Sequence, residues 1–358
     1  MKNRKLAYYL IFLLILFLVS GVITGIYYWR NYKLVKIDEQ ASIIDILEQN
    51  VEVCIQVRKI DGLCYSGETE PGVYAVMIEN QTESRPPSGL AEASLVYEAI
   101  VEAPITRFLA VFSLDKNIEK IGPVRSARPF YVDWAKEFDG PYVHVGGSDE
   151  ALNLLDKIYK YDLNEFSAGG YFWRAWTRRA PHNVYTSSEL IQRAMENRNW
   201  EVENDFLSWQ FKPEAEYSER GNTETIKIDY ATYDYSVEWV YDKDNNIYKR
   251  FMAGSAHEDD NGEQIVAKNL AIIYTDSTVI DDYGRRKTRT IGSGEAIVFI
   301  DGQTIKGTWK RPTLENRTKF YDESMNEISF NGGTTWLEVI PSHYPKVVVQ
   351  ENLGIISE

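Results

Sequence analysis

Residues 95–113 read LVYEAIVEAPITRFLAVFS and hold two apolar runs on either side of the dipeptide Ala103-Pro104. The runs Leu95–Glu102 and Arg107–Ser113 are rich in β-branched and aromatic residues, which favour strands. A third run of similar composition, Val73–Ile78, lies a short distance upstream. We therefore expect these segments to form strands of a buried sheet.

Helical patterns follow these strands along the chain. They cover Pro129–Phe138, Ser148–Ile158 and Ser187–Asn199, and a short strand pattern, Tyr142–Val145, lies between the first two. Strands that alternate with helices indicate an α/β unit. We place this N-terminal domain at residues 71–200.

The sequence changes character after residue 200. Residues 201–222 are rich in Glu, Ser and Pro and are predicted to be a linker. Residues 223–350 contain short alternating runs separated by turn signals such as Asp301-Gly302. These runs predict a mostly antiparallel β-rich C-terminal domain with a tail at 351–358, so the expected class is α+β.

The stretch Leu6–Trp29 contains no charged residue. As a helix it would span roughly 36 Å, enough to cross a hydrocarbon core of about 30 Å. Basic residues flank it and Tyr and Trp gather at its ends, as in membrane helices. Residues 1–30 are therefore predicted to be a cytoplasmic tip and a transmembrane signal anchor. A cleaved signal peptide is the alternative, although its apolar core is usually only about 7–15 residues long.

This orientation keeps the basic N-terminus in the cytoplasm and places the rest of the chain outside the cell membrane. Residues 31–70 are mixed and polar and are predicted to be a stalk. The stalk holds both cysteines of the chain, Cys54 and Cys64. An extracytoplasmic location allows a disulfide between them, and two unpaired thiols are the alternative, because the sequence does not give their Cα separation.

Composition excludes several protein classes. The chain of 358 residues carries a formal net charge of −14, so it repels nucleic acid and no nucleic-acid partner is expected. Its hydrophobic content of 44% excludes a disordered chain. Two cysteines are too few for a four-cysteine zinc site or a disulfide framework.

Positive charge gathers in three polar segments of the α/β region, SRPPSG at 84–89, IEKIGPVRSARP at 118–129 and RRAPHN at 178–183. Arginines, hydroxyls and free backbone N–H groups recognise anions, so these segments predict a cleft for an anionic ligand. The alternative is that each arginine pairs with a nearby acid such as Glu98, Glu102 or Asp133 and pins a loop. The candidate ligand-binding residues are Arg85, Ser88, Arg107, Arg125, Ser126, Arg128, Arg179, His182 and Asn183.

A glycine-rich turn is the last candidate. His144, Gly146, Gly147 and Ser148 lie at a strand-to-helix transition, where backbone N–H groups can cradle a phosphate or a carboxylate. The alternative is a plain turn with a capping residue. The segment lacks the P-loop and dinucleotide-binding motifs, so no cofactor is expected. No metal ligand set and no catalytic nucleophile is predicted either.

Several long stretches resemble the YerB-like family of bacterial envelope proteins (domain of unknown function 3048). They are RPPSGLAEASLVYEAIVEAPITRFLAVF, EKIGPVRSARPFYVDWAKEFDGPYVHVGGSDEAL, RRAPHNVYTS, GSGEAIVFIDGQTIKGTWKR and GGTTWLEVIP. The resemblance covers roughly Lys59 to Ser342. It implies an exported α/β domain followed by a smaller β-rich domain, and it specifies no reaction.

The chain departs from the family pattern at two places. Many members resemble lipoproteins with a cysteine after the signal, whereas this chain has Ser20-Gly21-Val22. A membrane helix is therefore expected to replace the lipid anchor. Relatives tend to carry paired glycines where this chain has Ala103-Pro104.

Taken together, these patterns predict a membrane-anchored extracytoplasmic protein that binds an anionic cell-wall or lipid-linked ligand. One alternative is an envelope enzyme that transfers phosphoryl groups or glycopolymers, with Glu98, Asp149 or His182 as the base. The other is a protein-interaction module that adds a partner strand to a sheet edge. If the arginines converge in one cleft, ligand binding or enzymatic transfer is favoured. If they are dispersed in separate salt bridges, the protein-interaction module is favoured.

Overall fold

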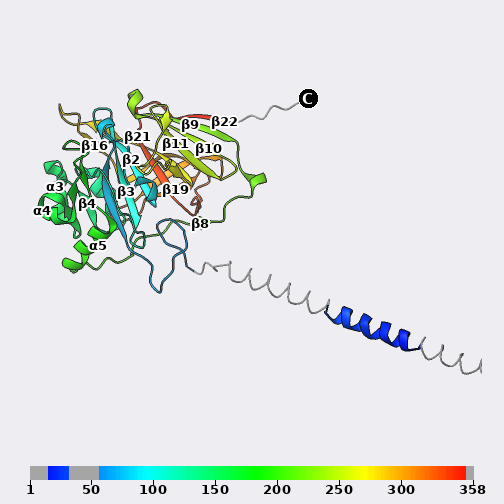
Figure 1. Cartoon of the computed structure of the whole chain (residues 1–358). Coiled ribbons are helices and arrows are strands. Elements are labelled where there is room, and N and C mark those ends of the chain that lie inside the picture. Colours follow the sequence, from blue (N-terminus) through cyan, green and yellow to red (C-terminus); the bar gives the residue numbers. More distant parts are fainter. Residues whose placement is uncertain (1–14, 32–55, 352–358) are drawn as a thin grey trace, which may run out of the picture. The chain divides into compact units, whose positions relative to one another are not determined.

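The computed structural model describes residues 15–31 and 56–351 (Figure 1). The chain divides into two compact units, Met1–Ile55 and Gln56–Glu358. Within the first, residues 15–31 form a helix whose side chains are exposed throughout. Among the described residues, no helix combines the length and the apolar character needed to cross a membrane. The predicted anchor begins at Leu6, and residues 1–14 lie outside the described part.

A mixed sheet of ten strands forms the centre of the second unit. In sheet order its strands are β19 (Lys319–Asp322), β18 (Gln303–Arg311), β17 (Gly292–Ile300), β14 (Asn269–Thr275), β21 (Thr335–Pro341), β2 (Leu95–Glu102), β3 (Ile105–Ser113), β1 (Val73–Glu79), β4 (Tyr142–His144) and β5 (Asp162–Asn164). The strands predicted around residues 73–78, 95–102, 107–113 and 142–145 are all present. Every residue of β1, β14 and β21 is buried, because apolar side chains cover both faces.

Four α-helices belong to this unit, namely α2 (Pro129–Ala135), α3 (Asp149–Ile158), α4 (Glu165–Ala168) and α5 (Ser188–Asn197). Ser148 caps α3 by accepting the N–H of Ala151, and Ser187 caps α5 by accepting the N–H of Leu190. Helices α3 and α4 lie beside β4 (Figure 1). Short 3₁₀ helices cover Thr82–Ser84, Leu90–Glu92, Gly169–Tyr171, Tyr217–Glu219 and Tyr233–Tyr235.

A second, antiparallel sheet packs against the first through a shared apolar core. Its strands are β12 (Ser255–Ala256), β11 (Ile247–Met252), β10 (Ser236–Asp242), β9 (Thr223–Asp229) and β22 (Val348–Glu351), with β13 (Val266–Ala267) paired to β11. Three two-stranded ribbons complete the unit, β6 (Trp173–Arg174) with β7 (Val184–Tyr185), β8 (Phe211–Lys212) with β20 (Phe330–Asn331), and β15 (Ser277–Val279) with β16 (Arg286–Thr288). The α+β class and the antiparallel C-terminal sheet are thus confirmed.

The two predicted domains share the central sheet. Strand β21 lies between β14 and β2 and runs parallel to both, so strands from 71–200 and from 223–350 form one ladder. The predicted linker, 201–222, contains β8 and the buried Trp209. The end of the predicted stalk also belongs to the globular unit, because Ile60 is buried and Arg58 pairs with Asp61 at 3.0 Å.

The chain adopts a left-handed backbone at Ala103, with φ of 48°. Glycine adopts this left-handed conformation more readily than residues with a Cβ do. Cys64 takes part in a disulfide bond. Cys54 lies outside the described residues, so the Cys54–Cys64 pairing stays a prediction.

A buried charged network joins the two sheets. Arg250 on β11 pairs with Glu98 on β2 and, at 2.9 Å, with Glu338 on β21, and all three side chains are fully buried. The guanidinium group of Arg250 lies 4.6 Å from the ring centre of Trp336. Glu338 also accepts hydrogen bonds from the Tyr230 hydroxyl at 2.7 Å and the Trp239 indole at 2.8 Å. Side chains from four strands, β2, β10, β11 and β21, therefore depend on one another in the core.

The network should make folding stability depend on pH. Burial, reinforced by the charge of Glu338, raises the pKa of Glu98 to about 8 despite the opposing charge of Arg250. Because the pKa of Glu98 is higher in the folded protein than in the unfolded chain, protonated Glu98 contributes to the free energy of unfolding. This contribution is complete below the ordinary pKa of 4.5 and is lost as the pH rises through about 8. Glu98→Gln should remove this loss between about pH 5 and 9. Urea unfolding across that pH range measures the effect, with the exposed Glu92→Gln as control. If the free energy of unfolding of Glu98→Gln fell with pH as steeply as that of wild type, the prediction would be contradicted.

Candidate functional site

Three of the predicted arginines converge where β1, β2 and β3 meet the segment that leads into α2. Arg107 on β3 lies opposite Glu79, the last residue of β1. Its guanidinium donates a hydrogen bond of 2.7 Å to the carbonyl of Ser126 and pairs with Glu102 at 3.4 Å. Arg128 also pairs with Glu102, and Arg125 pairs with Glu79 at 2.9 Å. We call Arg107, Arg125 and Arg128, with Glu79 and Glu102, the arginine cluster.

Backbone hydrogen bonds hold the segment that carries Arg125 and Arg128 between β1 and β4. The N–H of Arg125 bonds to the carbonyl of Met77 at 2.8 Å, and its carbonyl accepts the N–H of Val145 at 3.1 Å. Gly122 begins this segment with φ of 147°, where a Cβ would lie 2.9 Å from a carbonyl oxygen. A glycine is therefore required for the chain to pass this point.

The arginine cluster retains positive charge. Three guanidinium groups face two carboxylates, which leaves one net positive charge (3 − 2 = +1). Burial lowers the pKa of Arg125 and of Arg128, and the positive charge of Arg107 lowers both further. The Arg125 and Arg128 side chains are 22% and 14% exposed, so solvent reaches both. Such a cluster offers a partly desolvated positive site to an anion.

The loop that carries His182 borders this cluster. The second oxygen of the Glu79 carboxylate contacts His182 Nδ1 at 2.8 Å, and the other ring nitrogen lies 3.2 Å from Glu83. Asn183 turns away, because its side-chain oxygen accepts a hydrogen bond of 3.2 Å from Arg174. One carboxylate, that of Glu79, therefore links Arg125 to the loop of residues 175–183.

Three other predicted residues do not join the cluster. Arg85 donates hydrogen bonds to the backbone and side-chain oxygens of Asn80 at 3.2 and 3.1 Å and stacks over Tyr235. Ser88 is buried and forms a backbone bridge with Gly122. Arg179 is exposed and, within the described part of the chain, makes no side-chain hydrogen bond or ion pair. Arg85 and Ser88 therefore pin the loop at 84–89.

The glycine-rich turn has the geometry of a capped turn. The N–H of Gly146 donates to the Asn164 side chain at 2.9 Å, and the N–H of Ser148 donates to the carbonyl of Ala127. A Cβ added at Gly147 would lie 3.2 Å from the Cβ of the same Ala127. His144 is buried, and its ring nitrogens lie 2.6 Å from the Gly146 carbonyl and from Asp162. Because these donors already have partners, we do not include the turn in the proposed site.

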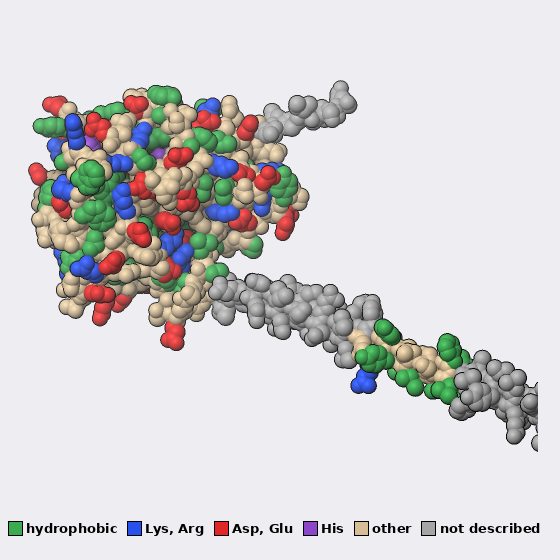
Figure 2. Space-filling model, viewed as in Figure 1, with side chains coloured by type: hydrophobic (Ala, Val, Ile, Leu, Met, Phe, Trp, Pro, Cys, Tyr) green, Lys and Arg blue, Asp and Glu red, His purple; other side chains and the backbone are tan. Residues whose placement is uncertain are grey.

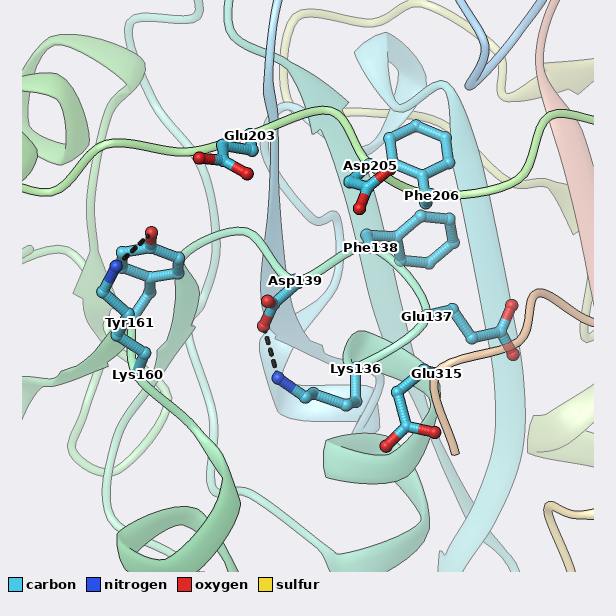
Figure 3. Close-up of a pocket in the computed structure, with 10 residues that line it drawn as sticks. All are labelled: Lys136, Glu137, Phe138, Asp139, Lys160, Tyr161, Glu203, Asp205, Phe206 and Glu315. Atoms are coloured by element: carbon cyan, nitrogen blue, oxygen red, sulfur yellow. Dashed lines mark hydrogen bonds and ion pairs between the residues drawn. The ribbon is translucent and has the colours of Figure 1, made fainter. Parts of the chain in front are cut away.

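Charge is mixed over the visible surface, where acidic and basic side chains alternate (Figure 2). Recognition of an anion must therefore be local. A hollow of about 340 Å³ lies on another part of the same unit (Figure 3). It is lined by Lys136, Glu137, Phe138, Asp139, Lys160, Tyr161, Glu203, Asp205, Phe206 and Glu315. Five acids against two lysines make this hollow unsuited to anions, and it contains none of the predicted ligand-binding residues.

Sequence reasoning missed Glu79 and Arg250. Glu79 ends an apolar strand, and Arg250 occupies an inward position of β11, between the buried Tyr248 and Met252. The two-residue alternation of β11 could have revealed Arg250, because the residue occupies a position of the buried face.

Among the described residues, no group of three or more His, Cys, Asp or Glu side chains is arranged to hold a metal ion.

Comparison with known proteins gives the family. The "Protein of unknown function (DUF3048) N-terminal domain" matches residues 62–201, and the corresponding C-terminal domain matches residues 226–337. The "Putative lipoprotein YerB" of Bacillus subtilis (strain 168) is 31% identical over 277 residues, 76% of this chain and 82% of that protein. The crystal structure of YerB protein from Bacillus subtilis superposes with a TM-score of 0.74 at 29% identity, over 83% of this chain and 100% of that one. This chain therefore belongs to the DUF3048 family.

Proposed function

We propose that this chain is an extracytoplasmic protein of the bacterial cell envelope, held at the membrane by the uncharged stretch Leu6–Trp29, which binds an anionic group at the arginine cluster. The described helix at 15–31 covers the C-terminal part of that stretch and continues two residues beyond it. The relative from Bacillus is described as a lipoprotein, and this chain has no cysteine where a lipid would be attached. A membrane helix with a cytoplasmic N-terminus would serve the same anchoring purpose.

The observation that carries the binding proposal is the unbalanced charge of the cluster. Here Glu102 serves both Arg107 and Arg128, so two guanidinium groups share one carboxylate. The Nε of Arg107 is buried and has no hydrogen-bond partner in the described structure. A phosphate, pyrophosphate or carboxylate group would balance the third charge and accept hydrogen bonds from Arg125 and Arg128.

The geometry favours binding over turnover. Of the three candidate bases, Glu98 is fully buried in the Arg250 network, and His182 has a carboxylate at each ring nitrogen. Asp149 is exposed in the first turn of α3, where it interacts favourably with the helix dipole. Glu98 and His182 therefore lack the free access to a bound anion that a general base requires.

Removal of the competing carboxylate tests the proposal. Glu102→Gln keeps the shape and the hydrogen-bond acceptor of the side chain but raises the net charge of the cluster from +1 to +2. Pyrophosphate should bind the full-length variant about tenfold more tightly than wild type, a change of about 1.4 kcal/mol. Titration calorimetry at low and high salt measures this, since salt screens the added attraction.

A matched control is Glu150→Gln, which removes an exposed acid from the first turn of α3. Its pyrophosphate affinity should stay within about twofold of wild type, because the change lies outside the cluster. If Glu102→Gln loses stability without any gain in pyrophosphate affinity, the arginines serve only to hold loops together.

A further inference from the structure

Exposed aromatic rings gather next to the arginine cluster. Phe166 on α4 is 73% exposed, Trp173 on β6 is 36% exposed, and Trp176 in the loop after β6 is 93% exposed. Large apolar side chains are rarely left so open, and an exposed group of them often marks a binding surface. We call Phe166, Trp173 and Trp176 the aromatic surface.

Two sets of contacts connect the aromatic surface to the arginine cluster. The loop that carries Trp176 is closed by a hydrogen bond from the N–H of Ala175 to the carbonyl of Asn183, and it contains His182, which contacts Glu79. On the other side, Phe166 packs against Gly146, 2.6 Å from where a Cβ would lie. The carbonyl of Gly146 accepts the N–H of Ala127, two residues after Arg125.

Basic side chains accompany the rings. Arg174 follows Trp173, is 47% exposed and pairs with Glu165 at 3.0 Å, whereas Arg179 is exposed in the same loop as Trp176 and has no ion pair within the described part of the chain. Trp173 is stacked on Tyr185 with ring centres 6.0 Å apart, which orients its ring. The surface therefore offers open ring faces and positive charge together.

We infer that the ligand of the arginine cluster is an anionic glycan, whose charged group lies at Arg125 and Arg128 and whose sugar rings stack on the aromatic surface. This inference rests on the proposed anion site. A sugar ring presents a flat face of C–H groups that packs on an aromatic ring, while its hydroxyls stay in water. A uronate or a phosphate on the same polymer supplies the charge that the cluster lacks.

The arrangement of the rings favours a glycan over a protein or a lipid surface. A protein interface or a membrane would require a continuous apolar area. Here the rings come from α4, β6 and a loop, Arg174 lies between Trp173 and Trp176 in the chain, and Arg179 follows Trp176 in the same loop. Rings accompanied by cations suit a polymer that carries both sugar rings and charges.

The test compares two polyanions on the full-length protein. Oligogalacturonate carries charges on sugar rings, and polyphosphate of equal charge carries charges without rings. In Trp173→Ala/Trp176→Ala the oligogalacturonate affinity should fall at least about tenfold, while the polyphosphate affinity should change less than about twofold. Trp176→Ala alone, which removes only an exposed ring, should show a smaller loss of the same kind.

Tyr217→Ala/Tyr233→Ala is the matched control, since it removes two exposed aromatic rings from another part of the unit. The affinities of this control variant for oligogalacturonate and for polyphosphate should both equal those of wild type. Equal loss for the two polyanions in the tryptophan variants, or no loss for oligogalacturonate, overturns the glycan inference but leaves the anion site intact. Loss of binding to anionic lipid vesicles, with oligogalacturonate binding retained, would assign the surface to a membrane and also overturn it. Failure of the anion site itself appears separately, as unchanged pyrophosphate affinity in Glu102→Gln.

Discussion

Arg250→Ala should destabilise the compact unit by about 3–5 kcal/mol, the cost of removing one partner from a buried ion pair. The substitution takes away the guanidinium that both Glu98 and Glu338 contact, and these register neighbours on β2 and β21 stay fully buried without it. It also removes the guanidinium that contacts both Trp239 and Trp336, at 5.1 and 4.6 Å from their ring centres. Both losses act at the junction of the two sheets.

Urea unfolding of the full-length protein measures this effect. The control is Lys249→Ala on the same strand, where the lysine pairs with Asp242 at 2.7 Å and its side chain is 40% exposed. A surface pair of this kind contributes less than about 1 kcal/mol. An Arg250→Ala protein that unfolds within about 1 kcal/mol of wild type would show that the network does not hold the sheets together.

Local composition was sufficient to predict the individual strands, but not their neighbours in the sheet. Segments such as VYAVMI and LVYEAIVE are apolar along their whole length, which makes them buried strands wherever they pair. The pairing of β21 with β2 joins segments that are more than 200 residues apart in the chain. No local pattern carries that information, so the sequence suggested two separate sheets.

The candidate site was predicted in part for a related reason. Arg107 begins a predicted strand, and Arg125 and Arg128 lie in a turn that leads to a predicted helix, where arginines and free backbone N–H groups can meet. Arg85 and Ser88 occupy a similar place in the sequence but face inward, where they hold the loop at 84–89. The difference depends on side-chain direction, which the sequence does not reveal.

The glycine-rich turn shows the same limit. Its sequence fits an anion cradle and a capped turn equally well, because both use glycine followed by serine. The choice depends on whether the N–H groups are free. Asn164 and Ala127, which lie elsewhere in the chain, accept those of Gly146 and Ser148.

Arg125→Ala/Arg128→Ala should abolish most of the anion affinity. Each arginine can donate a charge-assisted hydrogen bond to a bound anion, worth about 1.5 kcal/mol or more. The loss of both amounts to about 3 kcal/mol, or roughly a hundredfold in affinity. Because the two side chains are 22% and 14% exposed, their removal leaves no fully buried cavity.

The control variant, Arg193→Ala/Lys306→Ala, removes the same number of positive charges from exposed positions on α5 and β18. This control distinguishes the loss of a defined binding site from the loss of general electrostatic attraction to the anion. That general attraction weakens when any cation is removed. Its urea unfolding curve and that of Arg125→Ala/Arg128→Ala should both show a single folded baseline.

The most direct test of the anion site is calorimetric titration of pyrophosphate into full-length wild type, Arg125→Ala/Arg128→Ala and the control variant under the same salt conditions. The arginine cluster predicts a loss of roughly a hundredfold in the first variant and less than about threefold in the control. Equal pyrophosphate affinity in the two variants would contradict a binding site at Arg125 and Arg128.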